Sequence, residues 1–198
     1  MSMTDLKSVQ FFANFLGVGL VVDGRNGYYT QRFVRMFQDT FQLGVYSGVG
    51  RLVVDGKPGP KTLEAMRLCR EQGGRVSRHF RYQEFRNKGS LTPTVTNHVI
   101  RLDRELVTSL ERLREDVGPI HIASGYRSRD WNRRVGGVWN SQHTYGKAVD
   151  LYRSRMAATV TEAQARAAGF KGVGIESRSN PSVIHLDVRP APARWYYQ

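Results

Sequence analysis

The chain has 198 residues, of which 30 are lysine or arginine and 17 are aspartate or glutamate, so its formal net charge is +13. Its 40% content of hydrophobic residues is enough for a buried core and excludes an intrinsically disordered chain. The single cysteine, Cys69, excludes an intramolecular disulfide framework and a zinc site made of cysteines. No apolar run approaches the roughly 20 residues that a membrane-spanning helix needs. The length allows one ordinary domain or two small ones.

An internal repeat marks the first part of the chain. Residues 21–30 (Val-Val-Asp-Gly-Arg-Asn-Gly-Tyr-Tyr-Thr) match residues 53–62 (Val-Val-Asp-Gly-Lys-Pro-Gly-Pro-Lys-Thr). Each Asp-Gly-x-x-Gly is typical of a turn, because aspartate bonds to its own backbone and glycine tolerates positive φ. Apolar residues at helical spacing follow each copy, and a further helix over about Leu6–Leu16 precedes the first. We therefore predict a small helical module of three helices.

The repeat resembles the peptidoglycan-binding module of wall hydrolases, which carries Val-Asp-Gly-x-x-Gly-x-x-Thr before a helix. The resemblance covers about Asp5–Gln72. Nearly every motif residue also has a turn or capping role, so the motif predicts the fold of the module better than its ligand. We expect Tyr28 and Tyr29, just after the first turn, to contact the wall. The glycine pair that follows is the predicted boundary, which divides the chain into 1–74 and 75–198.

Helical and strand patterns alternate in the second domain. A helix is predicted over Thr96–Val117 from apolar residues at spacings of three and four, and Gly118-Pro119 ends it. A shorter helix is predicted over Glu162–Ala168. The segment Trp131–Trp139 is predicted to be a loop. Strands are predicted at four places: Ile120–Ala123, Val149–Leu151, Gly172–Glu176 and Val183–Val188. The expected fold class is α+β, with the helical module followed by a domain that contains a small antiparallel sheet.

Two separated segments carry side chains that can bind a metal ion. Residues 141–150 contain His143 and Asp150, and the apolar run 183–188 contains His185 and Asp187. In a strand His185 and Asp187 face the same side, and a core strand has little reason to place both there unless that side lines a polar site. Spacing alone is weak support for a metal site. With His143, Asp150 and His185 as ligands, a zinc ion would keep a fourth position open for water, as catalytic zinc sites do.

These segments closely resemble peptidase family M15, the zinc peptidases of the D-alanyl-D-alanine carboxypeptidase type. The matching residues are Ser-x-His-x-x-Gly-x-Ala-x-Asp at 141–150 and His-x-Asp at 185–187. Ser-Gly-Tyr-Arg at 124–127, His-Phe at 79–80, Glu-Phe at 84–85 and the ending with Arg-Trp at 194–195 are also similar. The resemblance covers about Ser77–Gln198. It implies a zinc-dependent endopeptidase or D,D-carboxypeptidase that hydrolyses an amide bond in the stem peptide or crosslink of peptidoglycan.

The resemblance also implies catalytic roles for residues near the metal. Arg127 would pair with a substrate carboxylate or the developing oxyanion, or would form a structural ion pair. The general base is either Glu176 or Asp187, and Asp187 could instead orient a metal ligand. Many family members carry an acid three residues before the last histidine, where this chain has Ser182. This departure leaves the choice between the two carboxylates open.

The expected partners follow from charge and from the family resemblance. Ser141 and Tyr145 are expected to contact the substrate, which is peptidoglycan. The basic charge also suits anionic wall polymers or lipopolysaccharide, and no nucleic-acid-binding motif is present. The apolar stretch Phe11–Val22 lacks the basic leader and the cleavage site of a signal peptide. We expect a monomer that is made in the cytoplasm and acts on the wall, in the periplasm or outside the cell, after release.

Several function classes remain open at this point. The size, the wall-binding-like module and the missing signal favour a bacteriolytic enzyme of a bacteriophage, an endolysin, over a bacterial wall-remodelling enzyme. One alternative is a non-catalytic wall-binding protein whose zinc site is structural. Another is a basic nucleic-acid-binding protein, which the net charge of +13 alone would permit.

Overall fold

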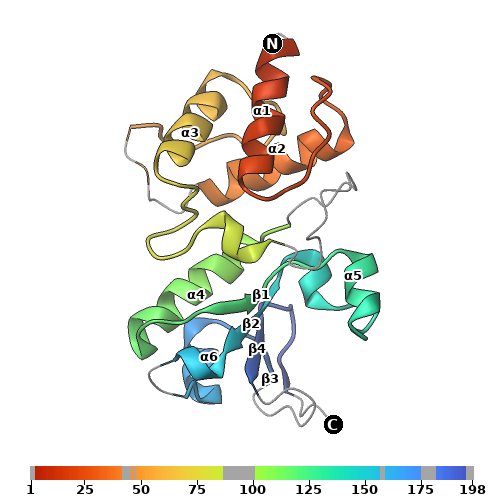
Figure 1. The fold of residues 1–198 in the computed structure, drawn as a ribbon. Helices are drawn as coiled ribbons and strands as arrows, with labels where there is room; N and C mark the ends of the chain where they lie inside the picture. Colours follow the sequence, from red (N-terminus) through yellow and green to blue (C-terminus); the bar gives the residue numbers. More distant parts are fainter. Residues whose placement is uncertain are drawn as a thin grey trace.

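The computed structural model describes residues 3–41, 46, 48–86, 101–156, 159–174 and 182–194. Figure 1 shows a group of helices from the N-terminal part of the chain above a sheet flanked by further helices from the C-terminal part. None of the helices in the described ranges has both the length and the apolar character that crossing a membrane requires. The predicted α+β class is confirmed.

Three helices form the N-terminal part, as predicted: α1 (Met3–Phe15), α2 (Tyr28–Thr40) and α3 (Pro60–Glu71). Aromatic rings fill the space between the first two. The ring of Phe12 on α1 meets that of Phe37 on α2 edge-on, with 5.3 Å between centroids. Such T-shaped pairs stabilise a core beyond the area they bury. Pro60 lies in the first turn of α3, where its missing N–H has no helical partner to lose.

Each copy of the repeat closes around a buried glutamine from the preceding helix. In the first copy Gln10 Nε2 donates to Asp23 Oδ1 at 2.7 Å and to Thr30 Oγ1 at 3.3 Å. Gln10 Oε1 accepts the N–H of Gly24 at 2.9 Å. One side chain thus joins the turn to the start of α2, and this explains why aspartate, glycine and threonine occur at these positions.

The second copy repeats the arrangement with Gln38 of α2. Its Nε2 donates to Asp55 Oδ1 at 2.9 Å and to Thr62 Oγ1 at 3.2 Å, while its Oε1 accepts the N–H of Gly56 at 2.8 Å. The interpretation of the repeat as a turn motif is confirmed. The two glutamines lie outside the repeated residues, so the comparison of the two copies did not reveal them.

The predicted domain boundary lies in a segment tied to both parts of the molecule. Gly74 donates its N–H to the carbonyl of Cys69 at 2.8 Å and accepts from the N–H of Tyr82 at 2.9 Å. The buried hydroxyl of Tyr82 is 2.7 Å from Thr40 Oγ1 on α2. The division at residue 74 stays a prediction, and these contacts show that the two parts pack together.

The sheet contains five strands in the order β1-β2-β4-β3-β5: β1 (Ile122–Ser124), β2 (Ala148–Tyr152), β3 (Gly172–Gly174), β4 (Val183–Asp187) and β5 (Ala193–Arg194). The predicted antiparallel pairing holds for β1 with β2, β2 with β4 and β3 with β4, whereas β5 pairs with β3 in parallel. After β4 the chain reverses its direction, and β5 then pairs with the edge of β3 that does not face β4. Both β3 and β5 therefore run opposite to β4, so they are parallel to each other.

Helices α4 (Arg104–Val117) and α6 (Glu162–Ala168) cover the sheet in Figure 1. The helix predicted over Thr96–Val117 begins later than predicted, because residues 101–103 are not helical. Residues 96–100 lie outside the described ranges. Asp103 ends the extended segment, because its side chain accepts from the N–H of Glu105 and so caps α4. The shorter helix has the predicted bounds, with Thr161 as its cap and Gly169 at φ 109° after it.

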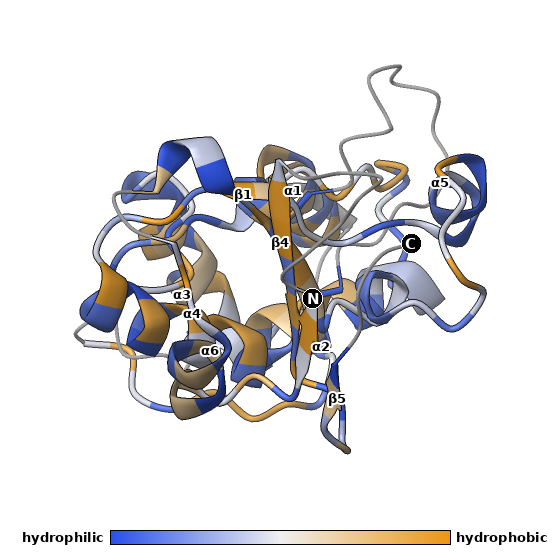
Figure 2. Cartoon of the chain, turned by 90° about the horizontal axis from the view of Figure 1, so that it is seen from below, coloured by the Kyte–Doolittle hydropathy of each residue, from blue (hydrophilic) through white to orange (hydrophobic). Residues whose placement is uncertain are grey.

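The segment Trp131–Trp139, expected to be a loop, begins inside α5 (Arg129–Arg134), so that prediction is wrong over 131–134. Ser128 Oγ accepts the N–H of Trp131 at 3.1 Å and starts this helix. Figure 2 shows α5 as a mostly polar element, whereas β4 is largely apolar. The described residues also form short 3-10 helices: η2 (Tyr82–Phe85), η3 (Gln142–Tyr145) and η4 (Arg153–Arg155).

Candidate metal centre

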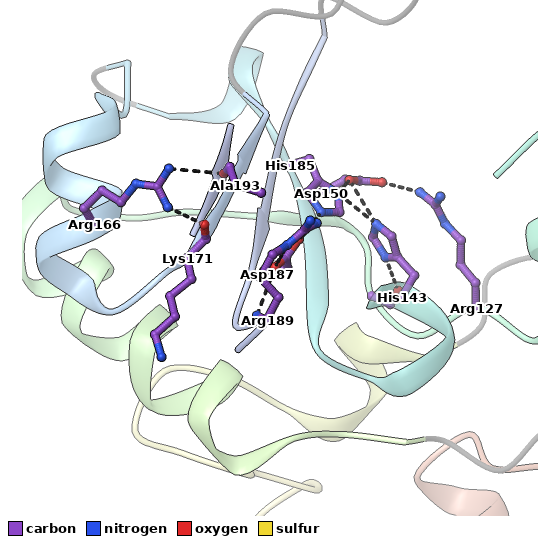
Figure 3. Close-up of polar contacts among 10 residues, drawn as sticks. Arg127, His143, Asp150, Arg166, Lys171, His185, Asp187, Arg189 and Ala193 are labelled. Atoms are coloured by element: carbon purple, nitrogen blue, oxygen red, sulfur yellow. Dashed lines mark hydrogen bonds and ion pairs between the residues drawn. The ribbon is translucent and has the colours of Figure 1, made fainter. Parts of the chain in front are cut away.

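Three side chains that can bind a metal ion meet at the middle of the sheet. His143 comes from η3, Asp150 from β2 and His185 from β4. His143 Nε2 is 3.2 Å from Asp150 Oδ1 and 3.1 Å from His185 Nδ1, and His185 Nδ1 is 3.0 Å from the same carboxylate oxygen. Figure 3 shows the three side chains pointing toward one another. All three are buried, with 2%, 8% and 5% of their surfaces exposed. We call this group the triad.

Strand pairing brings two members of the triad together. Asp150 and His185 are direct partners in the antiparallel register of β2 and β4. Side chains at directly opposed positions project on the same face of a sheet, about 5 Å apart at Cβ. A slip of one residue would move His185 to the other face. The register is therefore what places these two side chains within reach of a common atom.

Both histidine rings are held by the nitrogen that does not face the triad. His143 Nδ1 lies 2.7 Å from the carbonyl oxygen of Gly125. His185 Nε2 lies 3.1 Å from Asp187 Oδ2. Arg189 fixes that carboxylate in turn, donating from Nε to Oδ1 at 2.8 Å and from Nη2 to Oδ2 at 2.5 Å. A hydrogen bond from the outer ring nitrogen to a carbonyl or carboxylate is the usual support of a metal-binding histidine.

The triad's protonation is set by opposing effects. Burial alone would raise the pKa of Asp150, but the charges and hydrogen bonds of the two histidines lower it well below its usual range. Burial lowers the pKa of His143. Burial would also lower the pKa of His185, but hydrogen bonds and charges from Asp150 and Asp187 raise it above its usual value. Of the two imidazoles in the triad, His185 therefore holds a proton more tightly than His143.

The geometry fits a metal ion. Ligand atoms at roughly 2.0–2.1 Å from a tetrahedral zinc ion lie about 3.3 Å apart. The three distances in the triad, 3.0, 3.1 and 3.2 Å, are close to that value. With one ligand atom taken from each residue, the three atoms lie within 4.8 Å of one another. Two imidazoles and one carboxylate suit zinc, and three protein ligands are typical of catalytic rather than structural zinc sites.

Arg127, expected at the substrate or the oxyanion, contacts the triad itself. Its Nη2 pairs with Asp150 Oδ2, and its Nε donates to Ser124 Oγ at 3.0 Å. Its backbone N–H donates to the carbonyl of His143 at 3.1 Å. The guanidinium thus occupies one carboxylate oxygen of Asp150, and the other oxygen faces the two histidines. These contacts favour the ion-pair interpretation of Arg127.

Two glycines allow the close packing around the triad. Gly146 has φ 71°, and a Cβ there would lie 2.1 Å from the carbonyl oxygen of Arg101. Gly172 of β3 lies opposite Asp187 of β4, and a Cβ there would lie 2.2 Å from Asp187 Oδ2. A Cβ at Gly172 would displace Asp187, which supports His185, and a Cβ at Gly146 would displace the backbone of Arg101.

The other predicted site residues are not part of the triad. Ser141 precedes η3 and makes its contacts through the backbone, while Tyr145 at the end of η3 is exposed. Tyr28 and Tyr29 are exposed at the start of α2. Glu176 lies outside the described residues. The substrate roles of these residues stay predictions.

Sequence reasoning did not identify Arg189 and Gly172, which position Asp187. A signal for Arg189 was present, because residues two apart in a strand face the same side and an arginine two positions after a buried aspartate can pair with it. Gly172 could not be found this way, since its role depends on which strand lies beside β4.

Comparison with known proteins agrees with this geometry. The family described as Peptidase M15 matches residues 78–187. The chain belongs to the peptidase M15 family. A relative of this M15 chain is the zinc D-Ala-D-Ala carboxypeptidase of Streptomyces albus G, with 29% identity over 159 residues. The match covers 78% of the M15 chain but only 58% of the relative. The predicted zinc cofactor agrees with the name of this relative and with the triad.

Proposed function

We propose that the chain is a zinc-dependent peptidase that hydrolyses an amide bond in the peptide part of peptidoglycan. The observation that carries the proposal is the buried triad of His143, Asp150 and His185, whose ligand atoms lie within 4.8 Å of one another inside a peptidase family match. The name of the Streptomyces relative supports both the metal and the substrate class. The peptide fragments released from the wall distinguish an endopeptidase from a D,D-carboxypeptidase.

The residues of the site are proposed to have separate roles in amide hydrolysis. Bound zinc supplies a Lewis acid that polarises a carbonyl group and acidifies water. His143, Asp150 and His185 would hold it, and Arg127 keeps Asp150 oriented through the second carboxylate oxygen. Asp187 is fully buried, and Arg189 and His185 bind its two carboxylate oxygens. We therefore assign Asp187 the role of a positioning residue.

The general base is therefore proposed to be Glu176 rather than Asp187. Burial would raise the pKa of Asp187, but Arg189 and His185 lower it well below its usual value. A base works best when its pKa lies near the operating pH, and a carboxylate with so low a pKa is a weak proton acceptor. The Glu176→Gln variant tests this assignment of the general base, because the exchange keeps the size of the side chain and removes its basicity.

The role of the enzyme in a cell is a finer proposal. The N-terminal repeat, with its resemblance to a wall-binding module, supports an enzyme that is held on its polymeric substrate, as an endolysin is. The exposed Tyr28 and Tyr29 suit contact with such a surface, since aromatic side chains bind sugars and peptides through their faces. Lysis of bacteria by the added protein would support the endolysin proposal.

Digestion of purified peptidoglycan tests the proposed function. The zinc-loaded protein is expected to release peptide fragments whose masses, read by mass spectrometry, identify the bond that is cut. A chelator should stop the reaction and added zinc should restore it. Walls that bind the protein but yield no new fragments would favour the non-catalytic alternative. Salt-sensitive retention of DNA without wall binding would favour the nucleic-acid alternative.

Zinc affinity is expected to fall as the pH falls, because zinc must displace a proton from His185. The pKa of His185 is raised above its usual value, so competition by protons begins at a higher pH than for an ordinary histidine. Below that pKa the apparent affinity should fall about tenfold per pH unit. Zinc competition against a coloured chelator between pH 5 and 8 measures this slope.

The Asp187→Asn variant is the matched comparison for the pH dependence. Asparagine keeps the shape of the side chain but removes the negative charge that raises the pKa of His185. The fall in zinc affinity should then begin at a lower pH. An unchanged pH profile would show that Asp187 does not set the proton affinity of His185.

A further inference from the structure

A second group of polar contacts lies at the edge of the sheet that β3 and β5 form, next to the metal centre. Arg166 of α6 reaches this edge with its guanidinium. Its Nη1 donates to the carbonyl of Lys171, and its Nη2 donates to the carbonyl of Ala193 at 3.1 Å. Figure 3 shows the guanidinium beside both of these residues. Arg166 has no part in the catalytic roles proposed above.

The two carbonyl groups belong to the parallel pair of strands. The N–H of Ala193 donates to the carbonyl of Lys171 at 2.7 Å, at the point where β5 begins to pair with β3. Because β5 has only two residues, its pairing with β3 offers few backbone hydrogen bonds. Arg166 adds one hydrogen bond to the backbone of each partner, so one side chain joins β5 to the start of β3.

Both β3 and the segment that follows β4 contact Asp187. The N–H of Lys171 donates to the carbonyl of Asp187 at 2.9 Å. Gly172 lies against the carboxylate, since a Cβ there would be 2.2 Å from Oδ2. Arg189 donates to both carboxylate oxygens, at 2.8 and 2.5 Å. The carboxylate is therefore held between β3 and the segment that carries Arg189.

The segment that carries Arg189 is short and stiff. Residues 188–192 join β4 to β5, and two of them are Pro190 and Pro192, whose rings fix the backbone angle φ. One end of the segment is fixed by β4 and the other by the pairing of β5 with β3. The position of β5 therefore determines where Arg189 lies relative to Asp187.

We propose that Arg166 is a positioning residue of the metal centre, which acts through Asp187 on the orientation of His185. By joining β5 to β3, its guanidinium keeps both supports of the carboxylate in place. Groups that orient a metal-binding histidine through its outer nitrogen raise the affinity for the metal. The inference rests on the proposed function, because it takes the triad as the zinc site. It makes zinc affinity depend on α6, a helix that supplies no ligand.

Zinc affinity of the full-length Arg166→Met variant tests this inference. Methionine keeps an unbranched side chain and a high helix propensity but removes the donors to both carbonyl groups. The affinity should fall about tenfold, the lower end of the range for groups that support a metal ligand. Arg166→Lys keeps the charge but offers one donor nitrogen in place of two, so it should lose only about threefold. It also provides the test if Arg166→Met fails to fold.

Two comparisons separate positioning from stability. Arg112→Met removes the same charge from an exposed position on α4 and should keep the wild-type affinity. In the Asp187→Asn background, Arg166→Met should change zinc affinity less than about twofold, because the carboxylate through which it acts is already lost. A role in stability alone would lower the affinity equally in both backgrounds, and that result would overturn the inference.

Proton NMR of the metal-free protein gives a readout that does not need zinc. The ring proton between His185 Nε2 and Asp187 Oδ2, which are 3.1 Å apart, should resonate far downfield and should disappear in Asp187→Asn. Arg166→Met should shift or broaden this signal, and Arg112→Met should leave it unchanged. The inference is overturned if Arg166→Met keeps both the wild-type signal and the wild-type zinc affinity.

A failure of the proposed function remains distinguishable from a failure of this inference. If the wild type binds zinc and Arg166→Met weakens that binding, but walls are not hydrolysed, the proposed function fails and the positioning role stands. If walls are hydrolysed and Arg166→Met changes neither zinc affinity nor the ring-proton signal, the proposed function stands and the positioning role fails. A wild type that binds no zinc overturns both.

Discussion

Replacing His143 by alanine is expected to abolish stoichiometric zinc binding and to lower peptidoglycan hydrolysis by about a thousandfold or more. The variant removes one of the three proposed ligands, and Asp150 and His185 alone cannot enclose the ion. The loss corresponds to several kcal/mol of barrier, the range attributed to a metal that stabilises developing charge. Metal content by mass spectrometry and release of peptide fragments from walls measure the two effects.

The matched control is His121→Ala. His121 is exposed and lies outside the triad, so its loss should leave zinc content and hydrolysis unchanged. Circular dichroism of both variants shows whether the fold is kept. If His143→Ala binds one zinc ion per chain and cuts walls at the wild-type rate, the triad is not the catalytic metal site.

Replacing Gly146 by alanine is expected to lower the free energy of unfolding by about 3 kcal/mol. The left-handed conformation at φ 71° costs a residue with a Cβ about 1–2 kcal/mol. A Cβ would also lie 2.1 Å from the carbonyl oxygen of Arg101, so the backbone must shift and disturb the Asp103 to Gly146 hydrogen bond. Urea unfolding monitored by tryptophan fluorescence measures the loss.

A control at Gly136 separates the cost of the backbone conformation from the cost of the contact with Arg101. It has φ 73°, nearly the value of Gly146, but nothing lies within 4 Å of the position a Cβ would take. Gly136→Ala should therefore show the conformational cost alone, about 1 kcal/mol. Zinc affinity should fall in Gly146→Ala, because the shift reaches His143 three residues earlier, and should be kept in Gly136→Ala. Equal stability losses in the two variants would show that the contact with Arg101 does not matter.

The sequence was informative about the site wherever the chemistry is local. His143 and Asp150 share one short segment, and alternation in a strand placed His185 and Asp187 on one side. The structure brings the three predicted ligands together. What sequence could not provide was the pairing between strands, since the direct opposition of Asp150 and His185 depends on contacts between distant segments. Arg127 had two open interpretations because its partner, Asp150, comes from another strand.

The fold was predictable to a similar depth. Local caps and glycines fixed the bounds of α6, and the Asp-Gly turns marked the starts of α2 and α3. The parallel pairing of β5 was missed, because strand direction follows from the path of the chain and not from composition. The predicted long helix failed at its start, where Asp103 prefers to cap α4 and to contact Gly146 instead of continuing a helical turn.

The direct opposition of Asp150 and His185 on β2 and β4 has a consequence for how this enzyme can vary. A metal ion bound by side chains from both strands would link these two adjacent strands at the centre of the sheet. The connection between these two strands supplies β3, whose Gly172 packs against Asp187. Changes in that connection should therefore keep the metal centre intact only where they leave the contact between Gly172 and Asp187 unchanged.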